Sequence, residues 1–215
     1  DDLNAARTGL TVNLRIGAVP TAVTFAAQAT TILRRAHPSL AVEIRSASAD
    51  HIQRGLTDLS LDIGVTYLRT ELPPGLESRH LYDERYVLIS PRSLVDTMRA
   101  DIPWVEAAEL PLCLLSTDMT NRKILDGVFE GLGVRPDLAF ETNAFTAALV
   151  QASAGLAATI APNKMVETLP IGSQLISLPL IEPDVAEPIG VVMAKQDPPS
   201  QTTTALISAC VEAAS

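Results

Sequence analysis

Small hydroxyl and amide side chains occupy the positions where predicted strands end and the following helices begin. They are Thr21, Ser48, Thr66 and Tyr67 in the N-terminal half, and Ser116, Thr117, Thr142 and Asn143 in the C-terminal half. Ligands of open parallel sheets bind outside the carboxyl ends of the strands, where helix N-termini present unpaired N–H groups. Such side chains suit a small polar or anionic ligand. Each is also explained as a helix N-cap, a position that Ser, Thr and Asn favour, so the prediction rests on the whole set.

Arg122 is a charged candidate in the first turn of a predicted helix. A cation there opposes the helix dipole and gains nothing locally. Two explanations stay open: a ligand anion binds the guanidinium, or the guanidinium forms a salt bridge with a nearby Asp or Glu. The first explanation makes Arg122 part of a binding site, and the second does not.

The common catalytic and cofactor motifs are absent from the sequence. The first strand-to-helix turn, residues 17–21, reads GAVPT, which lacks the glycines that bring a backbone onto a dinucleotide pyrophosphate. There is no Walker loop, HExxH, CxxC or GxSxG, so nucleotide, zinc and serine-hydrolase chemistry are not indicated. The three histidines belong to no set of nucleophile, base and orienting group that spacing alone could define. We therefore expect no enzyme, no cofactor and no metal.

Cys113 and Cys210 both lie inside apolar runs, far apart in the chain and without metal-ligand spacing. We interpret them as buried free thiols in a reducing compartment, which predicts a cytoplasmic protein. A disulfide between them stays open.

The elements that position the first set of side chains alternate between strand and helix. Strands are predicted at residues 10–17, 40–46 and 61–66. The helix after the first strand is capped at Thr21 or Thr24 and stops before Pro38. The helix after the second strand follows Ser48, and its inward-facing residues are Ile52, Leu56 and Leu59. Because crossovers between parallel strands are right-handed, this βαβαβ order predicts a parallel sheet covered by helices.

The same order recurs in the second half of the chain. Strands at residues 112–115, 138–141 and 156–161 begin 95 to 102 residues after their counterparts. The helices between them have expected caps at Thr117-Asp118 and at Thr142 or Asn143. Two similar lobes without sequence identity are the economical explanation.

Two further strand-like runs, 79–90 and 188–195, are the natural crossing strands between the lobes, and a last helix capped near Ser200 returns to the first lobe. The sequence therefore predicts an α/β fold of two Rossmann-like βαβαβ lobes joined by two crossing strands. The predicted organisation is a linker remnant at 1–9, lobe I at 10–90 with 189–215, and lobe II at 91–188.

Composition limits the kind of partner. The 16 Lys and Arg residues against 25 Asp and Glu give a formal net charge of −9, so direct nucleic-acid binding by this chain is not expected. A hydrophobic content of 47% with 19% charged residues indicates a globular protein with a buried core. The longest uncharged stretches are interrupted by polar residues, Gly and Pro, so we expect no association with a membrane.

Several segments, taken in order, resemble one family. They are LRIGAVPT, HPSLAVEIRSASADHIQRGLTDLSLDIGV, LESRHLYDERYVLISPRSL and AGLAATIAP. The set resembles the effector-binding domain of LysR-type transcriptional regulators over residues 10–215. Two positions depart from the family pattern. Leu59-Ser60 replaces the glycine usual before a Leu-Asp pair, and Ala157-Ala158 stands where a second glycine is more common.

The resemblance implies two lobes folded like a type II periplasmic binding protein, with a small metabolite bound between them. It also implies pairing into a homodimer or homotetramer, and contact with DNA only through an N-terminal winged helix-turn-helix outside this chain. Carried over by position, it implies effector contacts at the strand ends of both lobes. The predicted effector-binding residues are Pro20, Thr21, Ser48, Thr66, Tyr67, Ser116, Thr117, Arg122, Thr142, Asn143, Ala144 and Phe145.

Two other functions fit the same elements. An extracytoplasmic solute-binding protein shares the two-lobe order, because a fold does not fix a function. An enzyme using the same residues is the third hypothesis, with Tyr67, Asp118 and Arg122 as possible actors.

Overall fold

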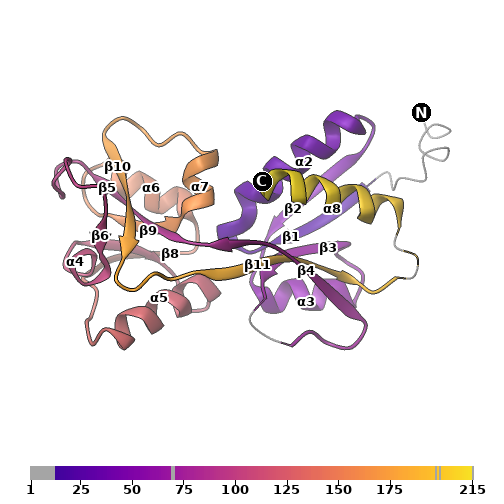
Figure 1. The fold of residues 1–215 in the computed structure, drawn as a ribbon, viewed down its shortest axis with the longest axis horizontal. Coiled ribbons are helices and arrows are strands. Elements are labelled where there is room, and N and C mark those ends of the chain that lie inside the picture. Colours follow the sequence, from indigo (N-terminus) through magenta and orange to yellow (C-terminus); the bar gives the residue numbers. More distant parts are fainter. Residues whose placement is uncertain (1–12, 69–70, 197, 199, 215) are drawn as a thin grey trace. The chain divides into compact units, whose positions relative to one another are not determined.

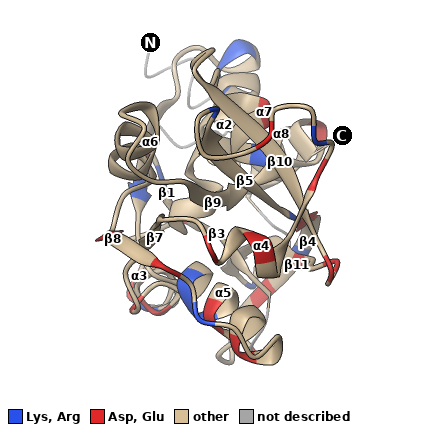
Figure 2. Ribbon diagram, turned by 90° about the vertical axis from the view of Figure 1, so that its left-hand side faces the viewer, with Lys and Arg blue, Asp and Glu red and all other residues tan. Residues whose placement is uncertain are grey.

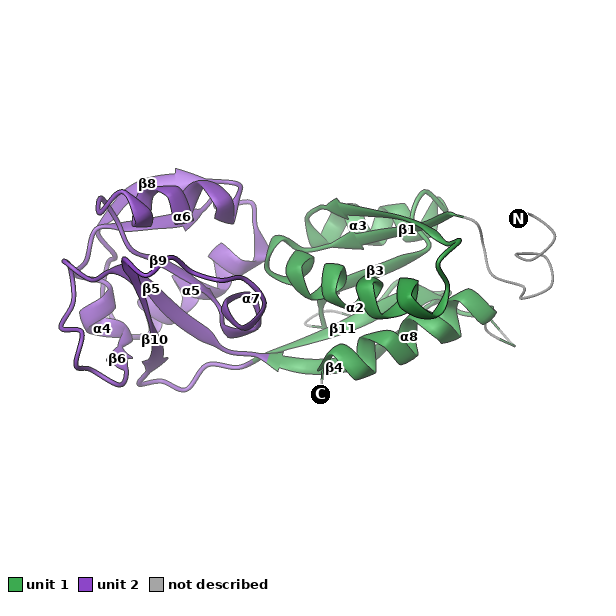
Figure 3. Ribbon diagram, turned by 90° about the horizontal axis from the view of Figure 1, so that it is seen from above, with its two compact units in different colours: residues 1–83, 187–215 green, residues 84–186 purple. Residues whose placement is uncertain are grey.

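The computed structural model describes residues 13–68, 71–196, 198 and 200–214. The chain divides into two compact units, unit 1 with residues 1–83 and 187–215, and unit 2 with residues 84–186 (Figure 3). The predicted linker at 1–9 and the first three residues of the predicted strand at 10–17 lie outside the described residues.

Unit 1 is built on a five-stranded sheet in the order β2-β1-β3-β11-β4 (Figure 1). Its strands are β1 (Asn13–Ala18), β2 (Ala41–Ser46), β3 (Ile63–Tyr67), β4 (Leu76–Glu84) and β11 (Glu187–Ala194). β1 pairs in parallel with both β2 and β3, whereas β11 runs antiparallel to β3. The helices α2 (Val23–Ala36) and α3 (Ala49–Thr57) make the two crossovers. The predicted βαβαβ unit of the first lobe is confirmed.

Unit 2 repeats this arrangement. Its strands are β5 (Tyr86–Pro91), β6 (Ile102–Pro103), β7 (Leu112–Leu115), β8 (Leu138–Thr142), β9 (Thr159–Pro162) and β10 (Leu175–Ile181). Its helices are α4 (Trp104–Ala107), α5 (Thr120–Gly131), α6 (Phe145–Ser153) and α7 (Asn163–Thr168). β7 and β8 are parallel, and a parallel bridge between Leu112 and Ala158 joins β7 to the start of β9. The second βαβαβ unit is also confirmed.

The chain passes between the units twice, from β4 into β5 and from β10 into β11. In each unit, the strand beside the third parallel strand runs antiparallel to it: β11 beside β3, and β5 beside β9. β5 therefore belongs to unit 2, although the sequence analysis placed residues 84–90 in the first lobe. The physical reason is its pairing, since both hydrogen-bonded neighbours of β5, which are β9 and β10, belong to unit 2.

The C-terminal helix α8 (Gln201–Ala214) packs against α2 in unit 1, as predicted (Figure 1). Ser200 caps it, because its Oγ accepts a hydrogen bond of 3.0 Å from the N–H of Thr203. Leu206 and Cys210 of α8 are buried, as are Phe25 and Ala29 of α2. The C-terminal helix α8 therefore belongs to unit 1, the unit that also contains β1.

The prediction that Leu59 faces inward is wrong. α3 ends at Thr57, and Leu59 lies beyond it with a φ of 63° and a side chain that is 66% exposed. The backbone at Leu59 is left-handed, a conformation that costs an L-residue roughly 1–2 kcal/mol and glycine almost nothing. This is the position at which the sequence lacks the glycine expected from the family pattern.

We expect Leu59→Gly to stabilise unit 1 by about 0.5–1 kcal/mol, because relief of the left-handed strain exceeds the added entropy of an unfolded glycine. Urea unfolding followed by circular dichroism measures the change. Leu59→Ala is the control, since it removes the same exposed side chain and keeps the strain. Equal stability of the two variants would contradict the explanation.

Candidate effector-binding site

The carboxyl ends of β1, β2 and β3 lie at one edge of the unit 1 sheet, because the three strands are parallel and in register. Thr21 follows β1 within the 3-10 turn η1 (Pro20–Ala22), whose first residue, Pro20, is half-buried. Thr21 Oγ1 lies 3.0 Å from the hydroxyl of Tyr67, the last residue of β3. Both side chains are buried. The structure thus brings together two predicted site residues that are far apart in the sequence.

Thr66, beside Tyr67 in β3, is 2% exposed, and its Oγ1 has no hydrogen-bond partner among the described residues. Buried polar atoms in proteins are almost always hydrogen-bonded, so an orphan hydroxyl calls for an explanation such as a water or a ligand. Among the described residues of unit 1, Thr24 near the start of α2 is the other threonine whose buried hydroxyl has no partner.

The N-cap explanation holds for Ser48. Its Oγ accepts a hydrogen bond from the N–H of His51 at 3.4 Å, and it also lies 2.8 Å from His51 Nδ1. The caps predicted for α2, α5 and α6 are wrong: the N-cap positions of these helices are Ala22, Met119 and Ala144, and none has a capping side chain. α5 and α6 begin one or two residues later than their predicted caps require. α2 begins one residue later than a cap at Thr21 requires and two residues earlier than a cap at Thr24 requires.

The unit 2 edge is formed by the ends of β7 and β8. The N–H of Ser116 donates to the carbonyl of Thr142 at 2.8 Å, which joins the two strand ends. Thr142 Oγ1 in turn accepts from the N–H of Ala144 at 3.2 Å. Thr117 and Asn143 are exposed. Four of the predicted residues thus lie beside one another at this edge.

Arg122 forms a salt-bridge network. Its Nε donates to Asp126 at 2.7 Å, and its Nη1 donates to Glu141 at 3.0 Å and to the carbonyl of Leu115 at 2.9 Å. Burial opposes the charge, but the two carboxylates outweigh it and raise the pKa of Arg122. Figure 2 marks the basic positions of α5 blue and its acidic positions red. Of the two explanations left open, the structure shows the salt bridge.

Phe145 is 8% exposed and packs in a buried cluster with Leu115, Met165 and Leu175. Its side chain thus has a place in the core of unit 2. Ala144, as the N-cap residue of α6, offers the site its backbone groups alone.

Sequence reasoning missed Asn121, the second residue of α5. Its side chain is 2% exposed, and neither its Oδ1 nor its Nδ2 has a hydrogen-bond partner among the described residues. A signal was present, because Asn121 stands three and four positions before Ile124 and Leu125 on the apolar face of the helix. A polar residue on such a face is unusual enough to single out.

The comparison with family models gives one match. The model described as the LysR substrate binding domain matches residues 7–215. The chain belongs to this family. The family resemblance expected from the sequence is confirmed.

Solved structures share the fold of this LysR substrate-binding domain. CbnR, a LysR family transcriptional regulator, has a TM-score of 0.77 and 19% identity, and the match covers 100% of this chain and 74% of CbnR. OxyR of Corynebacterium glutamicum has a TM-score of 0.81 and 19% identity, covering 99% of this chain and 68% of OxyR. The BenM effector-binding domain with its effector benzoate has a TM-score of 0.77 and 19% identity, and the match covers 94% of this chain and 92% of the BenM chain. The comparison with curated proteins found no match.

These comparisons confirm the predicted α/β fold of the type II periplasmic-binding-protein kind. They support the predicted function, effector sensing in a LysR-type transcriptional regulator, over the alternative of an extracytoplasmic solute-binding protein. Among the described residues, no helix is long and apolar enough to span a membrane. Within the same part of the chain, no cluster of His, Cys, Asp and Glu could hold a metal ion.

Both cysteines of this LysR substrate-binding domain are free and buried. Burial raises the pKa of the Cys113 thiol and raises that of Cys210 to about 12. Because the thiolate is the reactive form of cysteine, these groups are protonated and unreactive at neutral pH. The arrangement favours a structural role for the thiols over redox sensing.

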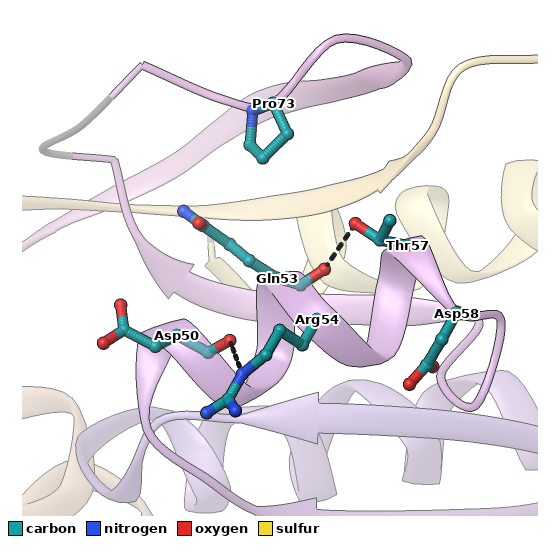
Figure 4. Close-up of a pocket in the computed structure, with 6 residues that line it drawn as sticks. All are labelled: Asp50, Gln53, Arg54, Thr57, Asp58 and Pro73. Carbon is teal, nitrogen blue, oxygen red and sulfur yellow. Dashed lines mark hydrogen bonds between the residues drawn. The ribbon is translucent and has the colours of Figure 1, made fainter.

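Two surface grooves are lined by residues other than the predicted ones. One, of about 510 Å³, runs along α3 and is lined by Gln53, Arg54, Asp58 and Pro73, among others (Figure 4). Arg54 there donates to the backbone carbonyl of Asp50 at 3.2 Å. The second, of about 610 Å³, lies in unit 2 along α5. Neither contains a predicted effector-binding residue.

Proposed function

We propose that this domain binds a small polar effector through the carboxyl ends of the parallel strands in its two units, and that binding controls the activity of a transcriptional regulator. One observation carries the proposal: hydroxyl and amide residues typical of N-caps stand at these edges, yet α2, α5 and α6 have no capping side chain. Helix capping therefore explains Ser48 alone in this set, and the hydroxyls of Thr21 and Thr142 have other partners within the protein. Ligand binding is the further role that parallel sheets place at these edges.

The chemistry of the edges favours a ligand held by neutral donors and acceptors. The candidates are hydroxyls, a side-chain amide and backbone N–H groups at helix starts, which suit small oxyanions or polar groups. Benzoate, the effector bound to BenM, shows that a small carboxylate is bound within this fold. The guanidinium of Arg122 is already paired with Asp126 and Glu141, so its charge is largely compensated within the protein.

An effector shifts the equilibrium between two conformational states of the regulator only to the extent that it binds one state more tightly than the other. That both edges contact the same molecule stays a prediction, as do a homodimeric or homotetrameric assembly and a cytoplasmic location. DNA contact through a helix-turn-helix outside this chain is part of the same proposal, because a net charge of −9 disfavours DNA binding by the domain itself.

We also infer that the domain catalyses no reaction. Of the three residues considered for an enzyme, Tyr67 is hydrogen-bonded to Thr21, and Arg122 is paired with two carboxylates. Turnover of a small metabolite that is abolished by Asp118→Asn would contradict this inference.

A thermal-shift screen against small metabolites identifies the effector. A ligand present at 100 times its Kd stabilises the folded state by roughly 2.7 kcal/mol. The domain is expected to respond to one chemical class of small polar metabolite. A broad panel without any response would contradict the proposal.

Once such a metabolite is found, calorimetry on two variants tests the edges. We expect Thr21→Val and Asn143→Ala each to weaken its binding by about tenfold, the loss of one hydrogen bond of roughly 1.4 kcal/mol. Thr31→Val and Ser153→Ala are the controls, since both residues are exposed on helices of the same units. Unchanged affinity in Thr21→Val and Asn143→Ala would remove these residues from the site.

A further inference from the structure

The side-chain amide of Asn121 is buried at the start of α5. The residue is 2% exposed, and both Oδ1 and Nδ2 lack partners among the described residues. An amide has two donor hydrogens and an acceptor oxygen, and proteins rarely leave all of them unsatisfied in the interior. Among the described residues, no group satisfies either the donor or the acceptor of this amide.

The position of Asn121 places this amide at the unit 2 edge. It is the second residue of α5, a helix of 12 residues whose N-cap, Met119, makes no side-chain cap. Helical side chains lean toward the N-terminus, so the amide points back toward the start of α5. The turn before the helix connects it to Ser116, since the N–H of Met119 donates to the Ser116 carbonyl at 3.0 Å.

The positive charge near the start of α5 is already paired, so it does not favour an anionic ligand over a neutral one. The adjacent guanidinium, that of Arg122, is occupied by Asp126, Glu141 and the carbonyl of Leu115. A carboxylate oxygen could accept a hydrogen bond from Asn121 Nδ2. A carboxylate has no hydrogen to donate to Asn121 Oδ1, however, so its lone pairs would face those of Oδ1. A neutral group with one donor and one acceptor side by side satisfies both atoms.

We propose that Asn121 determines effector specificity in unit 2 by binding a neutral amide-type group, such as a primary carboxamide, a urea or a cyclic amide. The inference rests on the proposed function, since it names the chemistry that one of the two edges recognises. Asn121 makes a direct contact and has no catalytic role.

The first test uses the domain without ligand. Because the amide has no partner, Asn121→Leu replaces an unsatisfied polar group with an apolar one of similar size, and we expect the Tm to rise by about 2–4 °C. Asn163→Leu is the matched control. Asn163 also stands at a helix start in unit 2, but its Oδ1 accepts from Arg85 N at 3.2 Å and its Nδ2 donates to Glu167 at 3.2 Å. This control variant is expected to lower the Tm.

The second test compares matched probes by thermal shift: nicotinamide with nicotinate, benzamide with benzoate, and glutamine with glutamate. We expect at least one amide to raise the Tm of the unmodified domain more than its carboxylate partner does. The difference should disappear in Asn121→Leu and persist in Asn163→Leu.

Three results would overturn the inference: a lower or unchanged Tm for Asn121→Leu without ligand, an amide response that survives in Asn121→Leu, or a panel in which no amide stabilises the domain. Failure of the proposed function looks different. There, Thr21→Val and Asn143→Ala retain full affinity, whatever Asn121→Leu does.

Discussion

Trp104→Ala is expected to lower the free energy of unfolding of unit 2 by about 3–5 kcal/mol, the largest effect predicted for a single substitution in this domain. Trp104 is fully buried, and its ring packs edge-on against Tyr86 and Phe129 with centroid distances of 6.0 and 5.7 Å. Its Nε1 donates to the carbonyl of Pro183 at 3.0 Å. Alanine leaves a cavity among these aromatic rings and removes the only indole in the chain.

Urea unfolding followed by far-UV circular dichroism measures the loss. Trp104→Phe should cost less, about 1–2 kcal/mol, because it keeps a ring in the cavity and loses the bond to Pro183. Met98→Ala, at a side chain that is 89% exposed in the same unit, should leave stability unchanged. A loss below about 1 kcal/mol for Trp104→Ala would show that this cluster does not hold unit 2 together.

Gly64→Ala is expected to destabilise unit 1 by about 1–3 kcal/mol, since a methyl group overfills a packed core. A Cβ at Gly64 would lie 2.3 Å from Ile52 Cγ2 and 3.3 Å from Leu56 Cδ1. Gly17, its register partner in β1, also lies against α3, with Ile52 Cγ1 at 3.1 Å from a Cβ there. The two glycines therefore let α3 pack directly onto the sheet.

The matched control is Gly127→Ala in α5, where a Cβ meets nothing within 4 Å. It should stabilise unit 2 by about 0.5–1 kcal/mol, because alanine favours a helix. Combining Gly64→Ala with Ile52→Ala should cost less than the sum of the two single changes, since the smaller side chain makes room. Strict additivity, or a neutral Gly64→Ala, would contradict the packing argument.

The alternation of apolar residues was enough to predict the two βαβαβ units, because the periods of strand and helix are local properties of the sequence. The strand β10 and the short elements β6, α4 and α7 were not predicted, and the run predicted at residues 79–90 is two strands, β4 and β5. Thr21 shows where this information ends. Its cap role was predicted from a local preference, but its hydroxyl pairs with Tyr67, a residue 46 positions away. Pairing at that distance depends on the sheet register, which the local pattern does not contain.

Leu59 and Arg122 show the same limit in two other forms. The helical spacing of apolar residues continues to Leu59, but the backbone has already left the helix at Asp58, so the side chain turns outward. Of the two carboxylate partners of Arg122, Asp126 is four positions away on the same helix and is accessible to sequence reasoning, whereas Glu141 is 19 positions away, on the next strand. Whether Asn121 has partners is likewise a property of the folded interior, although its place on an apolar face was visible.

Hydrogen exchange with and without a metabolite that raises the Tm tests the location of the effector site most directly. The account predicts slower exchange at the strand ends and helix starts of both units, at residues 18–23, 66–68, 116–122 and 142–146. Protection confined to the groove along α3, at residues 50–58, would contradict it, because that surface contains none of the residues assigned to the effector.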